Sequence, residues 1–129
     1  MPPDVSPPVL EVFYSPTCAP CRLELPAVAE IVHGKQARVH IVILDQEERA
    51  RSELRAVSDA LNSVATASAK MPADVLRASG DEHGILPYAR SLTADHEICA
   101  KWSGGLSVAR AKELLAACSR LISPRRSRS

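Results

Sequence analysis

Two features that mark specialised protein classes are missing from this sequence of 129 residues. No apolar run approaches the roughly 18 residues that a membrane-spanning helix needs, so we expect no membrane insertion of this segment. Charge of one sign is missing as well, because 16 Lys and Arg residues are balanced by 15 Asp and Glu residues. That balance removes the electrostatic argument for a nucleic-acid binder. The hydrophobic share of 46% is instead typical of one globular domain with a buried core.

The two ends of the chain have compositions unlike that of a packed core. Residues 1–8 hold four prolines, which favours an extended linker, and they lack the basic and apolar regions of a signal peptide. Such a linker is compatible with an anchor or a signal encoded upstream. Residues 123–129 are basic and predict a flexible tail, so we expect the folded domain to span residues 9–122.

Cysteine is scarce too, and four residues are too few and too scattered for a disulfide scaffold in a chain of this length. Cys18 and Cys21, however, form the motif Cys-Ala-Pro-Cys. Such a pair can supply half of a zinc site, but the sequence contains neither a second Cys-x-x-Cys nor a closely spaced His pair. Its histidines are scattered, at His33, His40, His83 and His96. A redox-active dithiol is the interpretation that we favour.

The first half of the chain predicts strands that alternate with helices. Two apolar runs rich in β-branched residues predict buried strands over Val9–Tyr14 and Val39–Leu44. The first strand is followed by a predicted helix over Ala19–His33, with a kink at Pro26 and with Gly34 as its C-cap.

The second predicted strand is also followed by a helix. Asp45 is expected to cap this helix, and Glu48 is expected to complete a capping box with it. Helical spacing predicts a buried stripe formed by Ala50, Leu54, Val57 and Leu61. The order strand, helix, strand, helix favours parallel pairing of the two strands through a right-handed crossover.

The second half of the chain has weaker patterns. Residues 63–84 are rich in Ala and Ser, and we expect there only a short helix that starts at Pro72 and is ended by Gly80. The segments Tyr88–Thr93 and Glu97–Trp102 flank a turn and predict a β-hairpin.

A last helix is expected to start after Ser107, a good N-cap, and to run to about residue 122. Its predicted apolar face consists of Val108, Ala111, Leu115, Cys118 and Ile122. Cys118 is therefore expected to be a core residue. Cys99 alternates with charged residues on the preceding strand, so we expect it to be partly exposed, and a second redox role for it remains an alternative.

These features, in this order, resemble the thioredoxin superfamily over residues 9–122. A strand runs directly into Cys-x-x-Cys, and Pro26 follows the motif by five residues, where thioredoxins have a helix-kinking proline. Gly84–Pro87 resembles the segment that ends in the family's cis-proline, and Gly105–Ser107 resembles the turn before its last helix. The run from Cys18 to Pro26, Cys-Ala-Pro-Cys-Arg-Leu-Glu-Leu-Pro, is closer to the TlpA-like branch of bacterial thiol–disulfide reductases.

Two positions depart from the family's pattern. Thr17 stands where the family usually has Trp, and Val12 stands where thioredoxin has a buried Asp. Glu11, one residue earlier, faces the other side of the strand. The segments 15–18 and 86–88 also resemble the accessory protein of methylamine dehydrogenase maturation. Substrate identity and proton handling therefore stay open.

The resemblance implies an α/β fold, namely a thioredoxin-like three-layer α/β/α sandwich with a mixed sheet and a C-terminal β-hairpin plus helix. It also implies a thiol–disulfide oxidoreductase that needs no bound cofactor, because the dithiol carries the electrons. Cys18 and Cys21 would be the catalytic residues. The residues that would contact the substrate are Thr17, Ala19, Pro20, Leu86 and Pro87.

The resemblance also indicates partners and a place. The implied partners are proteins with disulfides or thiols and an upstream dithiol donor, and we expect a monomer. The expected localisation is the bacterial periplasm, with or without a membrane tether in the full-length protein, and the cytoplasm is the alternative. Two other functions stay open. One is a non-catalytic accessory or chaperone module for maturation of another protein, and the other is metal delivery with His83 near the site.

Elementary chemistry assigns different tasks to the two thiols of the motif. Cys18 precedes the helix, where free N–H groups and the helix dipole lower a thiol pKa to about 7 from about 8.5. Cys21, one turn into the helix, is expected to be more buried and to resolve the mixed disulfide. Arg22 adds a positive charge nearby. Glu24 is interpreted as a solvated helix residue rather than as a proton relay.

The residues between the cysteines predict a reductant. Ala19 and Pro20 carry no charge and no side-chain donor, whereas strong oxidants owe their character to a strongly stabilised thiolate. We therefore expect a reduction potential nearer the thioredoxin value of about −270 mV than the strong-oxidant value of about −120 mV. Equilibration against glutathione mixtures, read by alkylation of Cys18, measures this potential. A value above roughly −170 mV would contradict the prediction.

Overall fold

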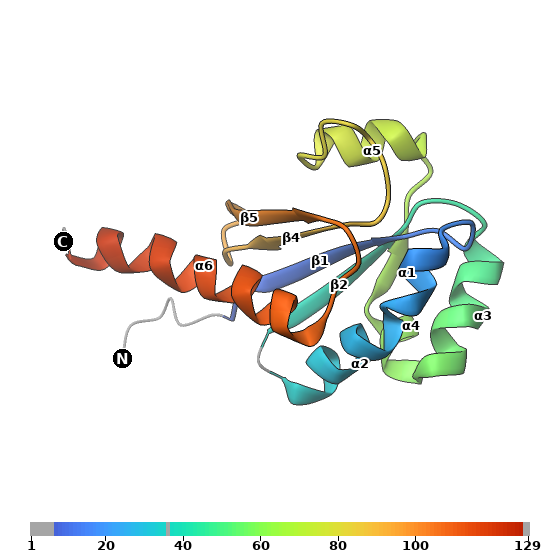
Figure 1. The fold of residues 1–129 in the computed structure, drawn as a ribbon, viewed down its shortest axis with the longest axis horizontal. Helices are drawn as coiled ribbons and strands as arrows, with labels where there is room; N and C mark the ends of the chain where they lie inside the picture. The colour runs from blue at the N-terminus through green and yellow to red at the C-terminus, as the bar shows by residue number, and fades with distance from the viewer. Residues whose placement is uncertain (1–6, 36, 128–129) are drawn as a thin grey trace.

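The computed structural model describes residues 7–35 and 37–127, with side chains up to residue 121 (Figure 1). Most of the predicted linker and the last two residues of the predicted tail lie outside the described residues. The strands are β1 (Val9–Tyr14), β2 (Arg38–Ile43), β3 (Ala65–Ala67), β4 (Tyr88–Leu92) and β5 (Ile98–Ser103). The helices are α1 (Ala19–Leu23), α2 (Leu25–Gly34), α3 (Glu47–Val57), α4 (Asp59–Ser63), α5 (Pro72–Ala78) and α6 (Val108–Ser127).

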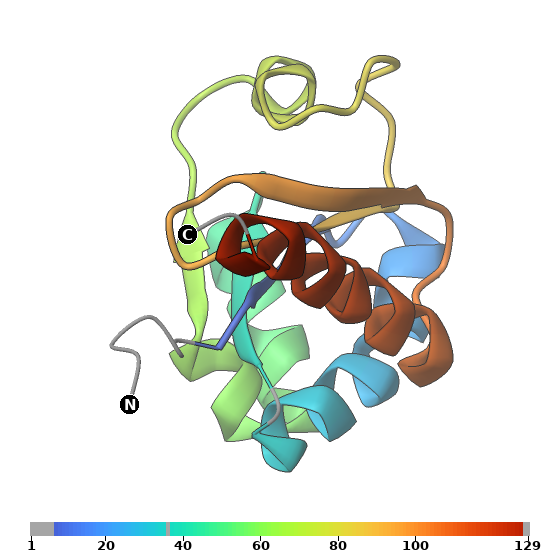
Figure 2. The ribbon, with the colours of Figure 1, turned by 90° about the vertical axis from the view of Figure 1, so that its left-hand side faces the viewer.

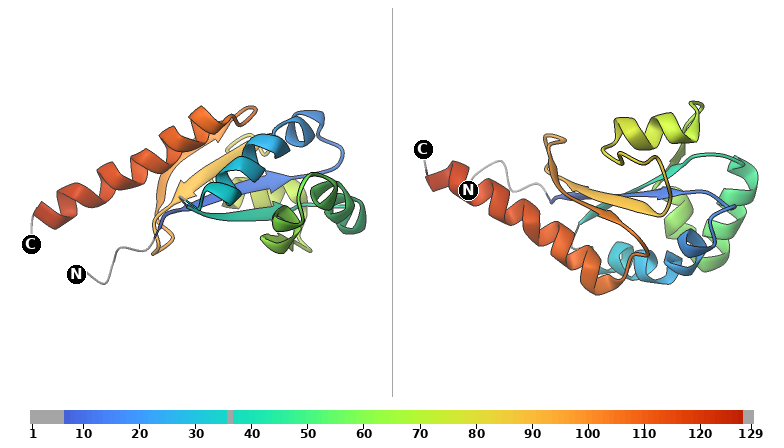
Figure 3. Two further views of the ribbon diagram at one scale, coloured as in Figure 1. Left: turned by 90° about the horizontal axis from the view of Figure 1, so that it is seen from below. Right: turned by 45° about the horizontal axis from the view of Figure 1, so that its top comes forward.

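The strands form one five-stranded sheet in the order β3-β2-β1-β4-β5. The first three of these are parallel, whereas β4 and β5 run antiparallel as the C-terminal hairpin. Helix α5 covers one face of the sheet, and α2 and α6 cover the other (Figures 1 and 2). Figure 3 shows α6 running along the face formed by the hairpin. The predicted three-layer α/β/α sandwich with a mixed sheet is confirmed.

Side chains of the central strand β1 alternate between two clusters of buried residues. Leu10, Val12 and Tyr14 join the main core, which the sheet shares with α2, α3, α4 and α6. Phe13 faces α5 and packs with Tyr88, Leu44 and Leu76. The same alternation places Glu11 on the α5 side, as predicted, because successive side chains of a strand point to opposite faces.

The helix predicted over residues 19–33 is in fact two helices, because the chain breaks at Glu24 between α1 and α2. Pro26 lies in the first turn of α2, where it lacks an N–H and where its ring would clash with the carbonyl of Arg22 in a continuous helix. The prediction of Gly34 as the C-cap was wrong as well. Lys35, with φ of 56°, takes the left-handed conformation, and Gly34 is the last residue of α2.

The predicted capping box of α3 does not form. Gln46, with φ of 48°, precedes the helix without a side-chain cap, and Asp45 instead accepts a hydrogen bond from Ser15 in the loop before Cys18. Val57 is 41% exposed, because α3 ends there and Ser58 turns to extended backbone that caps α4. The other members of the predicted stripe, Ala50, Leu54 and Leu61, are fully buried.

The second half of the chain contains one element that the sequence did not predict. Strand β3 has only three residues and forms because β2 offers it parallel partners along its free edge. Helix α5 starts at Pro72, as predicted. Helix α6 starts after Ser107, as predicted, but continues to Ser127. Within the described residues, no helix has the length and apolar character to cross a bilayer.

Candidate active site

The sheet brings two separated segments of the chain to one end. Phe13, near the end of β1, pairs with Tyr88 at the start of β4. The loop that follows β1 and the segment that precedes β4 therefore leave the sheet at the same end. The first leads to Cys18 and α1. The second contains Leu86–Pro87, whose peptide bond is cis, which confirms the sequence prediction.

The two sulfurs of the motif differ in their surroundings. Cys18 and Cys21 are joined by a disulfide, with their Cα atoms 5.2 Å apart. Cys18 is half-buried, whereas Cys21 is fully buried in the main core. The backbone N–H of Cys21 donates to Sγ of Cys18 at 3.2 Å. An external thiol or disulfide can thus reach Cys18 only, and a donor already in place there favours a thiolate on Cys18 once the bond opens.

The loop before Cys18 is held by a chain of hydrogen bonds. The Ser15 hydroxyl donates to Oδ1 of Asp45 at 2.6 Å and accepts from the backbone N–H of Thr17 at 3.2 Å. The backbone N–H of Cys18 donates to the Ser15 carbonyl at 3.0 Å. The guanidinium of Arg22, expected to add charge beside the thiols, donates to the carbonyl of Pro16. Asp45, which follows β2, thereby fixes the loop that leads to Cys18.

The residues predicted to contact a substrate come from the dithiol loop and from the segment before β4, and they differ in exposure. Thr17, Ala19 and Pro20 are exposed, whereas Leu86 and Pro87 are half-buried. Leu86 packs against both core clusters, and the Pro87 carbonyl accepts a hydrogen bond from the N–H of Gly104. Their contact with a substrate stays a prediction.

Glu24 is buried, which makes its interpretation as a solvated helix residue wrong. Its side chain is only 4% exposed because the break between α1 and α2 turns it inward. Its Oε1 accepts a hydrogen bond from the backbone N–H of Leu106 at 2.9 Å. Its Oε2 is buried without a hydrogen-bond partner among the described residues.

The surroundings of Glu24 change its acidity. Burial raises the pKa of its carboxyl to about 7, although the hydrogen bond from Leu106 acts in the opposite direction. The residue follows Cys21 by three positions, so the two lie on the same side of the α1 turn. A carboxyl with a pKa near 7, three residues along the chain from a buried thiol, is a candidate to accept and return a proton. The sequence places Glu24 three residues after Cys21 and two before Pro26, but it does not show that the side chain is buried.

The segment before β4 is held by Asp81. This residue is 4% exposed, and its Oδ2 accepts a hydrogen bond from the backbone N–H of Ile85 at 3.0 Å. Its carbonyl accepts from the N–H of Gly84 at 3.1 Å. Gly84 itself has φ of 64°, and an added side chain would meet the carbonyl of Ala73 at 3.3 Å. Asp81 thus sets the course of the chain toward Leu86 and Pro87.

The other two cysteines are also paired. Cys99 on β5 and Cys118 on α6 form a second disulfide, with Cα atoms 5.0 Å apart. Cys118 is 1% exposed, so the prediction of a core residue is confirmed, and Cys99 is half-buried as expected. The sequence did not indicate the bond, because the two cysteines lie nineteen positions apart on different elements whose packing the sequence does not give.

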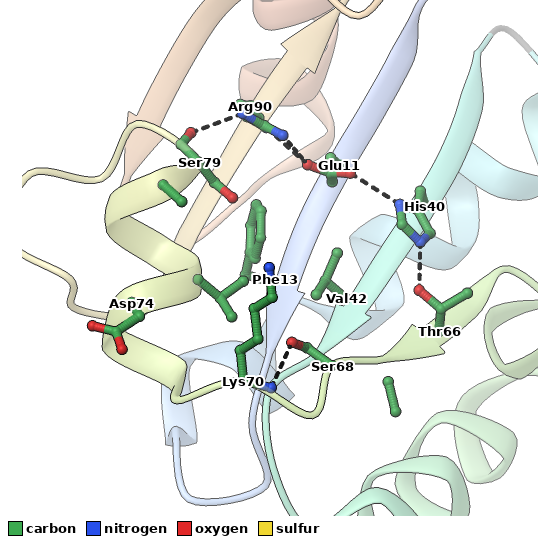
Figure 4. Close-up of a pocket in the computed structure, with 13 residues that line it drawn as sticks. Glu11, Phe13, His40, Val42, Thr66, Ser68, Lys70, Asp74, Ser79 and Arg90 are labelled. Carbon is green, nitrogen blue, oxygen red and sulfur yellow. Dashed lines mark hydrogen bonds and ion pairs between the residues drawn. The ribbon is translucent and has the colours of Figure 1, made fainter.

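A cavity of about 500 Å³ lies on the α5 face of the sheet and contains none of the cysteines (Figure 4). At one end of it Glu11 lies between Arg90, at 2.7 Å, and Nδ1 of His40, at 2.9 Å. Burial raises the pKa of Glu11, but the His40 hydrogen bond and the Arg90 guanidinium outweigh it, so the net shift is downward. Glu11 is thus an ionised residue of the α5 face and does not replace the buried Asp of thioredoxin.

No group of three His, Cys, Asp or Glu residues within the described residues is placed to hold a metal ion. His83, the residue on which metal delivery was considered, is exposed.

Comparison with known proteins supports the fold. No protein-family model matches the sequence, and no curated protein matches it significantly. The structure is similar to a thioredoxin-related protein from Neisseria meningitidis serogroup B, with TM-score 0.70 and 15% identity over 89% of this chain and 87% of that one. It is also similar to an exposed lipoprotein thioredoxin from Streptococcus pneumoniae, with TM-score 0.64 and 14% identity over 88% and 86%.

A third similar structure is a secreted disulfide oxidoreductase from Mycobacterium tuberculosis, with TM-score 0.60 and 15% identity over 88% of this chain and 81% of that one. At such identities the likeness concerns the fold. The chain therefore has the thioredoxin fold that its motifs predicted.

Replacing Glu24 by Gln should change how stability depends on pH. The raised pKa means that the folded state holds the Glu24 proton more tightly than the unfolded state, in which a Glu titrates near pKa 4.3. The protonated Glu24 carboxyl thus contributes its full stabilising effect below pH 4, and this effect is lost as the pH rises through about 7. Chemical denaturation should show about 4 kcal/mol of this loss in the wild type and little in Glu24→Gln.

The exposed Glu30 of α2 offers a matched control, because Glu30→Gln removes a carboxylate from the neighbouring helix without touching the core. Equal pH dependence in the wild type and in Glu24→Gln would show that Glu24 titrates normally.

Replacing Asp81 by Ala should loosen the segment before β4. The N–H of Ile85 loses its acceptor, and one such hydrogen bond is worth about 1–2 kcal/mol. Amide hydrogen exchange at Ile85 should therefore accelerate about tenfold. Asp81→Asn keeps an acceptor oxygen and should exchange as the wild type does. Unchanged exchange in Asp81→Ala would mean that the segment is held by other contacts.

Proposed function

We propose that this protein is a thiol–disulfide oxidoreductase that reduces or exchanges disulfides of protein partners through Cys18 and Cys21. The observation that carries the proposal is the unequal burial of two bonded sulfurs at the start of α1. One sulfur is reachable and the other is enclosed, which is what a nucleophile and a resolving thiol require. The thioredoxin fold, and a similar structure described as a disulfide oxidoreductase, support the same activity.

The reaction follows from the two environments. In the reduced protein, the Cys18 thiolate attacks one sulfur of the partner's disulfide, and that S–S bond breaks to release one partner thiolate. The Cys21 thiol then loses its proton and attacks Sγ of Cys18. The second partner thiolate leaves, and the Cys18–Cys21 disulfide forms. Two electrons have moved from the dithiol to the partner, so no bound cofactor is needed.

Glu24 is the proton acceptor that this sequence of steps requires. Cys21 is enclosed, so its proton cannot pass directly to bulk water. The Glu24 carboxyl, with a pKa of about 7 and with Oε2 unpaired among the described residues, is part ionised at neutral pH. It can therefore take the Cys21 proton during resolution and return it when the disulfide is reduced again. This replaces the buried Asp that thioredoxin has at the position of Val12.

The partner is proposed to dock at the end of the sheet where both segments meet. Thr17, Ala19 and Pro20 would contact it beside Cys18, and Leu86 and Pro87 would contact it from the segment before β4. Ile85, which is 65% exposed, adds apolar surface next to that segment. An apolar, exposed rim around a reactive sulfur suits an unfolded or extended protein segment.

The setting of this reaction is also a proposal. We place the protein as a monomer in the bacterial periplasm, with or without a tether outside the described residues, and with an upstream dithiol donor that reduces Cys18–Cys21 again. Similar structures include a secreted protein and an exposed lipoprotein, which supports a place outside the cytoplasm. The second disulfide supports it further, since such bonds persist in oxidising compartments.

Trapping variants test the assignment of the two thiols. Cys21→Ser should accumulate mixed disulfides through Cys18, because nothing remains to resolve them, whereas Cys18→Ser should accumulate few. Mass spectrometry of alkylated complexes identifies the bonded residue. In the reduced wild type, Cys18 should be alkylated first at mildly acidic pH. Faster alkylation of Cys99 or Cys118 would contradict the assignment.

Insulin reduction separates this activity from a non-catalytic accessory role. With a dithiol donor present, the wild type should accelerate insulin reduction at least about tenfold over the donor alone, and Cys18→Ser should not. If wild type and Cys18→Ser behave alike while both stay folded, the protein is an accessory module that keeps the fold for binding.

A further inference from the structure

The second disulfide lies away from the proposed active site. Cys99 follows Ile98, which pairs with Leu92 at the far end of the hairpin, whereas Tyr88 and Ser103 pair at the end where Leu86 and Pro87 leave the sheet. Four residue steps along β5 separate Cys99 from Ser103, which is roughly 13 Å in a strand. Cys99 thus lies at the end of the hairpin remote from the segment of Leu86 and Pro87, which leaves the sheet at the same end as the dithiol loop.

The bond also has a defined place in the packing. The buried face of α6 consists of Ala111, Leu114, Leu115 and Cys118. Cys118 is the last buried side chain of the helix among the described side chains, since Ser119 and Arg120 are exposed. On the other side, Cys99 belongs to β5, the edge strand of the sheet. The bond therefore fastens the distal part of α6 to an edge strand that has a partner on one side only.

We propose that the disulfide between Cys99 and Cys118 is a permanent structural cross-link. An external disulfide installs this bond, and the Cys18–Cys21 pair does not exchange with it. In the installing step the two thiols lose two protons and two electrons, and the external disulfide is reduced to two thiols. The inference rests on the proposed function only for the task given to Cys18–Cys21.

Burial explains why the cross-link resists reduction. Attack on Cys118 is blocked, because its side chain is only 1% exposed. Attack on the half-buried Cys99 would make Cys118 the leaving thiolate, and its buried neighbours along α6, Leu114 and Leu115, carry no proton donor. A thiolate in apolar surroundings is a poor leaving group. Cys21 is equally buried, but Glu24 follows it by three residues and can protonate it as it leaves.

Distance excludes exchange within one molecule. Cys18 lies at the end of the sheet where β1 finishes, and Cys99 lies at the other end of the hairpin. A nucleophilic sulfur must come within bonding distance of the sulfur that it attacks, along the axis of the bond that breaks. The rigid sheet between the two pairs does not allow this approach. A molecule can therefore hold a reducing dithiol and an intact disulfide at the same time.

Graded reduction tests the inference. The native protein is incubated with increasing dithiothreitol, and the free thiols are tagged and assigned by peptide mass spectrometry. Two thiols, Cys18 and Cys21, should appear at low reductant, and Cys99 and Cys118 should appear only at concentrations at least a hundredfold higher or after denaturation. Release of all four thiols over the same range, or disulfides that shuffle between the pairs, would overturn the proposal.

Paired variants test the task of the cross-link. The double variant C99S/C118S should lower Tm by about 10 °C, since the bond closes a loop of nineteen residues. It should retain insulin reduction at temperatures where it is folded. The matched double variant C18S/C21S should lose insulin reduction and keep the resistant pair. An unchanged Tm in C99S/C118S would show that the bond is not a structural cross-link.

The same variants distinguish failure of the structural cross-link from failure of the proposed oxidoreductase function. If C99S/C118S is destabilised while even the wild type fails to reduce insulin, the cross-link stands and the proposed function fails. Refolding of reduced protein completes the test. With oxidised glutathione the resistant pair should form, and without an external oxidant all four thiols should remain free with a lowered Tm.

Discussion

Strand β1 is hydrogen-bonded along both of its edges, to β2 in parallel and to β4 in antiparallel register. This double pairing determines most of what surrounds it. The parallel neighbour requires a crossover, which α1 and α2 supply, and the antiparallel neighbour requires that the chain return from the opposite direction. Because β4 runs antiparallel to β1, the end of β1 lies beside the start of β4. The dithiol loop and the segment of Leu86 and Pro87 are adjacent for that reason.

The alternation of side chains along β1 divides the protein into two chemically different faces. On one face, Leu10, Val12 and Tyr14 build the main core in which Cys21 and Glu24 are enclosed. On the other face, Glu11 is ionised between Arg90 and His40. A buried charge is tolerated there because it is paired on two sides. A buried carboxyl without an ionic partner has instead been moved toward the neutral form, as the pKa of Glu24 shows.

The contrast between the two disulfides follows from what lies next to each buried sulfur. Both Cys21 and Cys118 are buried. Glu24 follows Cys21 by three residues, and Cys18 stands at the start of a helix with the Cys21 N–H already directed at its sulfur. Burial alone would make either bond inert. In the mechanism that we propose, Glu24 accepts the Cys21 proton, and this makes the Cys18–Cys21 bond the reversible one.

The sequence by itself determined the elements and motifs whose signals are local. Strand β1, the dithiol, the kink at Pro26, the hairpin and the start of α6 all follow from residues within a few positions of one another, whereas the cis-proline was indicated by the resemblance to the thioredoxin superfamily. Apolar runs, proline positions and capping residues act over one or two turns, so they can be recognised without the fold.

Tertiary structure decided every feature that depends on residues far apart in the chain. Glu24 meets the Leu106 N–H across 82 positions, and Ser15 draws Asp45 away from its expected cap across 30. Strand β3 exists because β2 has a free edge, and Cys99 meets Cys118 because α6 packs on β5. Burial, and with it the raised pKa of Glu24, comes from the whole core. No local pattern carries that information, because exposure is a property of the packed chain.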